Sequence, residues 1–152
     1  MTNGLQGFNM PDKPWYRKTS RGYRLLKDLT VHTDIFPRSF VQTQYVNLTS
    51  TGVLLIKRGW EWDGATMAFD TEDFKLPSCV HDALYYLIQS GLIDSRHRKA
   101  ADDLMLRFCR FTKMPWPRRG WTWLGVRVFG RLALMVGKGK GAARTELPPP
   151  PP

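Results

Sequence analysis

The chain has 152 residues, of which 42% are hydrophobic and 24% are charged, and its formal net charge is +10. This length is enough for one folded domain with a buried core. The apolar stretches are too short to cross a bilayer, and the first residues lack the basic and apolar regions of a secretory signal. We therefore expect a protein of a cytoplasm, or of a particle assembled in one.

The first part of the chain predicts a small antiparallel sheet. Residues 1–18 are polar and contain glycine and proline, which predicts an extended N-terminal arm. Strand-like stretches follow at 22–33, 40–48 and 52–58, and the last of these is short, apolar and bounded by glycines. Residues 60–77 carry five acidic side chains without regular periodicity, which predicts an irregular acidic loop.

Three helices are expected after this loop. The first begins at Pro77, because proline suits a first helical turn, and runs to about residue 89. Asp94 can cap a second helix over 96–112, whose apolar side chains recur at spacings of three and four. The prolines near residue 116 interrupt the pattern, and a third helix is predicted over 119–136.

These elements predict an α+β fold. A single domain over 19–136 holds the small antiparallel sheet packed against three helices, and the first two helices form an antiparallel pair. The tail over 137–152 is basic and ends in five prolines, which predicts a flexible segment. Cys79 and Cys109 are out of register across the helix pair, which predicts two free, buried thiols.

The positive charge is concentrated near the C-terminus. Between residues 104 and 145 there is no acidic side chain, whereas the rest of the chain has thirteen basic and thirteen acidic residues. This distribution favours binding to a polyanion, such as anionic lipid, nucleic acid or an acidic partner subunit. For the third helix itself the sequence favours a core helix that closes the domain, and the alternative is a helix that lies on a membrane surface or binds single-stranded nucleic acid. The candidate contact residues are Arg118, Arg119, Trp121, Arg127 and Arg131.

A run around His81 and Asp82 carries the candidate chemistry. If the first two helices are antiparallel, Asp102 lies opposite His81, fixes its tautomer and makes its other nitrogen a better base. Asp82 points about 100° away from His81 around the helix, towards the acidic loop. There Asp63 and Gly64 can add oxygen ligands, and such ligands suit Ca²⁺. The pattern predicts either a buried His–carboxylate pair that holds the two helices together, or a His81–Asp102 base next to a divalent cation held by Asp63, Asp82 and Gly64.

The run from His81 to Tyr85 resembles the His-Asp-x-x-Tyr helix of secreted phospholipases A2. In that family the histidine is the general base, the next aspartate binds calcium, and an aspartate on the following antiparallel helix orients the histidine. The resemblance implies catalytic roles for His81 and Asp102, and calcium ligation by Asp82 and the loop at 62–66. The chain lacks the cysteines that link the phospholipase helices, and its loop contains fewer glycines.

A longer set of motifs resembles domain-of-unknown-function family 1353 of tailed phages and prophages. The motifs are at 62–66, 80–85, 95–96, 101–102 and 125–130. The resemblance implies a phage origin and a shared architecture, and the family has no established reaction. It favours a virion- or tail-associated structural protein that binds other phage structural proteins. The alternative is a phospholipase A2-like, cation-dependent hydrolase of lipid esters.

Overall fold

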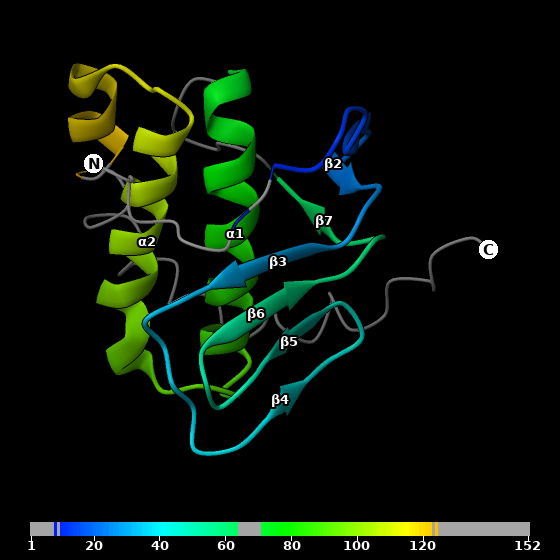
Figure 1. Cartoon of the computed structure of the whole chain (residues 1–152), viewed down its shortest axis with the longest axis vertical. Helices are drawn as coiled ribbons and strands as arrows, with labels where there is room; N and C mark the ends of the chain where they lie inside the picture. The colour runs from blue at the N-terminus through cyan, green and yellow to red at the C-terminus, as the bar shows by residue number, and fades with distance from the viewer. Residues whose placement is uncertain (1–7, 9, 64–70, 123, 125–152) are drawn as a thin grey trace.

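The computed structural model describes residues 8, 10–63, 71–122 and 124 (Figure 1). Strands occupy the first part of the chain and helices the second, so the predicted α+β fold is confirmed. The strands are β1 Tyr16–Thr19, β2 Gly22–Leu25, β3 Leu29–His32, β4 Val41–Gln42, β5 Val46–Leu48, β6 Val53–Ile56 and β7 Glu61–Trp62.

The strands form two antiparallel sheets where the sequence predicted one. The first has the order β1-β2-β7, with Tyr23 opposite Trp62, and the second has the order β3-β6-β5-β4. Backbone hydrogen bonds from Leu25 N to Trp60 O, 2.8 Å, and from Gly59 N to Leu25 O, 2.9 Å, connect the end of β2 to the turn between β6 and β7. These bonds tie the two sheets together.

The helices are α1 Glu72–Gln89 and α2 Arg98–Phe111, with a short 3₁₀ turn at Ser95–His97 before α2. Asp94 caps this turn and not α2 itself, because its Oδ1 accepts a hydrogen bond of 2.8 Å from the amide of Arg96, whereas α2 has no side-chain cap. A further helical segment covers residues 116–122 and 124. Figure 1 shows α1 and α2 side by side, with the strands next to α1.

The predicted start of the first helix is wrong, because α1 begins at Glu72 and contains Pro77 in its interior. Proline has no amide hydrogen, so Pro77 cannot bond the carbonyl oxygen of Asp73 four residues earlier. The hydroxyl of Thr112, at the end of α2, donates a hydrogen bond to that oxygen instead. The second helix therefore replaces the bond that Pro77 removes from the first.

Three other boundaries differ from those expected from the sequence. The acidic loop is shorter than predicted, because residues 61–62 form β7 and residue 72 begins α1, while residues 64–70 lie outside the described part. The third helical segment begins at residue 116 rather than 119, since Pro117 is tolerated in a first turn. Its predicted continuation over 125–136 lies outside the described residues.

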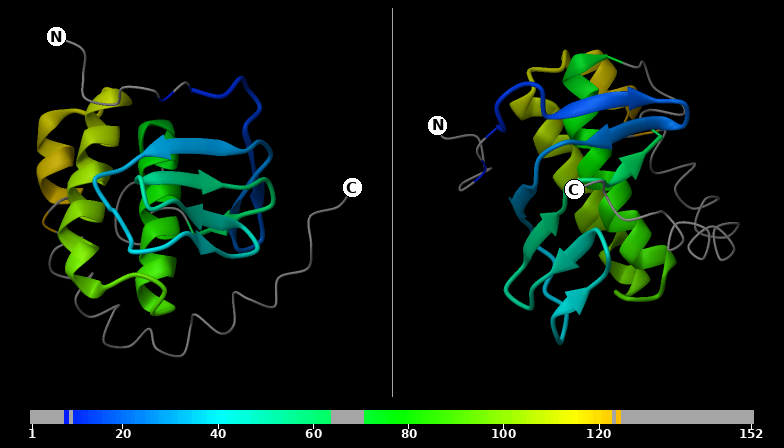
Figure 2. Two further views of the ribbon diagram at one scale, coloured as in Figure 1. Left: turned by 60° about the horizontal axis from the view of Figure 1, so that its bottom comes forward. Right: turned by 90° about the vertical axis from the view of Figure 1, so that its right-hand side faces the viewer.

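The core lies between the helices and the sheets, and the two views of Figure 2 show both helices on one side of the strands. Three buried tryptophans, Trp15, Trp60 and Trp62, are among its largest side chains. Trp15 lies in the predicted arm 1–18, and β1 overlaps the end of that arm, so this part belongs to the folded domain. Cys79 and Cys109 are free and buried, as predicted.

Candidate functional site

A histidine on α1 and an aspartate on α2 meet between the two helices, as the sequence predicted. His81 Nε2 lies 2.9 Å from Asp102 Oδ1. The Asp102 side chain is 1% exposed and that of His81 is 12% exposed. A carboxylate only accepts hydrogen bonds, so Nε2 carries the hydrogen and Nδ1 of the neutral ring is left as an acceptor. This arrangement gives His81 the tautomer of a general base.

Tyr85 completes the cluster from the same face of α1. Its hydroxyl donates a hydrogen bond of 2.7 Å to the same Asp102 Oδ1. The rings of His81 and Tyr85 also pack together, with centroids 4.1 Å apart. Residues four apart share a helix face, which is why His81 and Tyr85 reach one carboxylate. The hydrogen bond from Tyr85 was not predicted from the sequence, and the spacing of four residues from His81 was the signal that could have indicated it.

Arg98 approaches the other side of the carboxylate. Its Nε lies 4.0 Å from Asp102 Oδ2, one turn earlier on α2. Oδ2 is buried, and within the described part of the protein no hydrogen bond to it is found. The guanidinium of Arg98 therefore brings a positive charge beside the buried carboxylate of Asp102. Arg98 was not predicted from the sequence, although its spacing of four from Asp102 places the two on one helix face.

The two acidic neighbours in the sequence have different surroundings. Asp103 extends to the surface and pairs with Lys99 at 2.6 Å, with its side chain 45% exposed. Asp102 lies between the two helices instead, with its side chain 1% exposed.

Of the three predicted metal ligands, the structure describes Asp63 and Asp82. The indole of Trp62 donates to Ser78 Oγ at 3.1 Å, which brings the end of β7 to the turn of α1 before Asp82. Asp63 follows on an exposed position, Asp82 is half-buried, and Gly64 lies outside the described residues. Among the residues placed by the structure, no group of three His, Cys, Asp or Glu could hold a metal ion.

Asp63 and Asp82 are the two predicted carboxylate ligands among the described residues, and Ca²⁺ takes about six to eight oxygen ligands. Calcium binding at Asp63, Asp82 and Gly64 stays a prediction.

Three of the predicted polyanion-binding residues are described, and they differ in their roles. Arg118 turns inward, where its Nη1 bonds Asp73 Oδ2 at 3.1 Å and its Nη2 bonds the hydroxyl of Thr71. Arg119 is half-buried, and Trp121 is exposed. Arg127 and Arg131 lie outside the described residues. Arg118 thus holds the third helical segment onto the first turn of α1.

Comparisons of this chain with protein-family models, with curated proteins and with solved structures found no match. The resemblances to the phage family and to phospholipases A2 therefore stay predictions. Across the described residues, no helix is long and apolar enough to span a membrane.

Proposed function

We propose that this protein hydrolyses carboxylic esters, with His81 as the general base. The observation that carries the proposal is the bond between His81 Nε2 and the buried Asp102, which leaves Nδ1 as the proton acceptor. Histidine is the side chain best suited to exchange protons near neutral pH. The resemblance of residues 81–85 to the phospholipase helix favours lipid esters as the substrate class.

In this mechanism Nδ1 of His81 removes a proton from water while the water oxygen attacks the ester carbonyl carbon. Asp102 stabilises the imidazolium that forms, because its carboxylate accepts the Nε2 hydrogen bond. The tetrahedral intermediate then collapses, and the bond between the carbonyl carbon and the alcohol oxygen breaks. His81 returns its proton to that oxygen, and the products are a carboxylic acid and an alcohol. Tyr85 holds Asp102 in place through its hydrogen bond, and Arg98 adds a positive charge beside the carboxylate.

The test is the release of fatty acid from mixed phospholipid vesicles, measured by mass spectrometry with and without Ca²⁺. We expect His81→Ala and Asp102→Asn to lower kcat by about 10²–10⁴-fold, the usual contribution of an oriented base. Asp103→Asn is the matched control, since it changes the neighbouring carboxylate, which faces solvent. Equal rates of fatty acid release for wild type and His81→Ala would refute the hydrolase.

A structural role is the second candidate, and the burial of Asp102 favours it. The carboxylate links α2 to α1 through two hydrogen bonds in a nearly closed environment. In a phage virion or tail protein, such a cluster would hold α1 and α2 together and catalyse no reaction. In that case His81→Ala lowers the free energy of unfolding by about 1–3 kcal/mol, because a buried acceptor loses its partner. Wild type then releases no fatty acid and co-purifies with phage particles.

A further inference from the structure

The helical segment at residues 116–124 turns an apolar face to solvent. Trp116 is 76% exposed, Trp121 is 73% exposed and Leu124 is 46% exposed. Pro117 and Gly120 lie between them and are also exposed. At 3.6 residues per turn these five positions fall within an arc of about 140°. We name these five residues the tryptophan face. The face has no polar side chain, whereas a surface helix usually turns polar side chains to solvent and apolar ones to the core.

The opposite side of this segment is already engaged with the domain. Arg118 bonds Thr71 and Asp73 at the start of α1. The buried hydroxyl of Thr122 contacts the sulfur of Met114 at 3.9 Å, and Met114 itself packs in a small buried cluster. The segment therefore cannot turn its tryptophan face inward without losing these contacts. The face is held at the surface by the fold.

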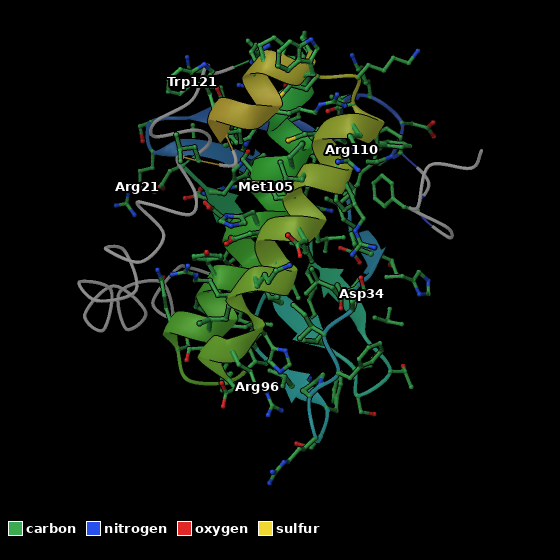
Figure 3. All side chains as sticks on the ribbon, turned by 90° about the vertical axis from the view of Figure 1, so that its left-hand side faces the viewer. Arg21, Asp34, Arg96, Met105, Arg110 and Trp121 are labelled. Atoms are coloured by element: carbon green, nitrogen blue, oxygen red, sulfur yellow. The ribbon has the colours of Figure 1, made fainter. Side chains whose placement is uncertain are left out.

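Basic residues flank the tryptophan face along the sequence. Arg110 and Lys113 precede it and are both exposed. Figure 3 shows Trp121 at the end of the molecule where Arg110 lies, away from Arg96 at the other end of α2. The sequence from 104 to 145 adds further basic side chains and no acidic one.

From this combination we infer that the tryptophan face docks on an anionic membrane surface. Tryptophan prefers the boundary between lipid headgroups and acyl chains, and flanking Lys and Arg attract anionic headgroups. The segment would lie in the plane of the membrane, with Trp116 and Trp121 inserted and Leu124 between them. This inference does not depend on hydrolysis at His81.

Two other occupants fit the surface less well. A second copy of the chain would bring two strongly basic regions together, and their like charges repel. Single-stranded nucleic acid stacks its bases on aromatic rings, but the positions between the two tryptophans are Leu124, Pro117 and Gly120, which offer no stacking surface.

The full-length protein can be tested by flotation with vesicles of phosphatidylcholine, with and without phosphatidylserine. We expect binding to the vesicles that contain phosphatidylserine, a blue shift of tryptophan fluorescence, and a loss of about tenfold or more in affinity for Trp116→Ala/Trp121→Ala. The matched control is Phe36→Ala/Phe40→Ala, which removes two other aromatics that are 58% and 54% exposed. This control and His81→Ala are expected to bind like wild type.

Unchanged melting temperatures would show that both double variants are folded. Equal binding by wild type and Trp116→Ala/Trp121→Ala would overturn the inference. It would also be overturned if the tryptophan pair were needed for binding a single-stranded oligonucleotide or for self-association, and not for binding vesicles. Because His81→Ala keeps the face intact, failure of membrane binding and failure of hydrolysis are separate results.

Discussion

At the residue scale, burial in the core changes the acidity of the two cysteine thiols. Burial raises the pKa of the Cys109 thiol to about 12, and the negative charge of Asp73 adds to the effect. Burial also raises the pKa of Cys79 well above its usual value, with Asp82 as a second cause. A thiolate in either position would be a desolvated charge, so both side chains act as small apolar groups.

This shift predicts a loss of stability at high pH. An unfolded cysteine loses its proton near pH 9, whereas folded Cys109 keeps it to about pH 12. The unfolded state therefore binds fewer protons in this window, and the free energy of unfolding falls by up to about 1.4 kcal/mol per pH unit. Below pH 9 the stabilisation is fully present.

The measurement is urea unfolding at pH values from 7 to 11, for wild type and Cys109→Ala. Other groups titrate in both proteins, so the difference in slope isolates the thiol. We expect a shallower fall for Cys109→Ala above pH 9. Parallel curves would show that Cys109 ionises equally in both states.

At the element scale, α1 and α2 depend on each other through Pro77. The carbonyl oxygen that this proline leaves without its helical partner accepts a bond from Thr112 of the neighbouring helix. Arg118 bonds the carboxylate of the same residue, Asp73. The first turns of α1 are thus completed by groups that come about forty residues later in the chain.

A double-mutant cycle tests this dependence. Thr112→Val removes the hydroxyl while keeping the shape of the side chain, and we expect it to lower the free energy of unfolding by about 1–3 kcal/mol. Pro77→Ala restores a backbone amide that can bond Asp73 O within α1. In the Pro77→Ala background, Thr112→Val should cost clearly less. Equal costs in both backgrounds would show that Thr112 does not replace the missing helical bond.

Local patterns in the sequence were sufficient for the most regular elements. The strand at Val53–Ile56 and the pairing of His81 with Asp102 were both predicted and are confirmed. Each depends on residues close in sequence, or on two helices joined by a short turn. Periodicity and spacing describe such relations directly.

The elements that were missed depend on contacts between distant segments. The two-residue strand β7 exists because it pairs with β2, where Tyr23 lies opposite Trp62. The early start of α1 had a local signal in the acidic residues Glu72 and Asp73. Pro77 instead indicated a later start of the helix, because proline in a helix interior leaves a carbonyl oxygen without its partner. The hydroxyl that bonds this oxygen belongs to Thr112, which lies at the end of another helix and is far away in the sequence.

At the scale of the whole molecule, the net charge of +10 opposes the compact state. Several of the described ion pairs, such as Lys99–Asp103 and Arg107–Asp34, are at the surface and are worth about 0–1 kcal/mol each. Mutual repulsion of the unpaired positive charges is therefore expected to exceed the gain from these pairs.

Screening by salt should then stabilise the protein. We expect Tm to rise by a few degrees between about 20 and about 300 mM NaCl, since the Debye length shortens over this range. Circular dichroism measures Tm, and sodium sulfate at equal ionic strength is the control for specific anion binding. A fall in Tm with NaCl would mean that attractive pairs dominate the electrostatic energy.

The strand order has a consequence for behaviour at high concentration. Each sheet ends at one edge in a two-residue strand, β7 or β4, and at the other in a four-residue strand, β1 or β3. Strands this short offer an incoming chain few backbone hydrogen bonds, and on β1 the exposed Arg17 and Lys18 repel another basic copy. These edges therefore give little template for the strand addition that leads to aggregates or fibrils.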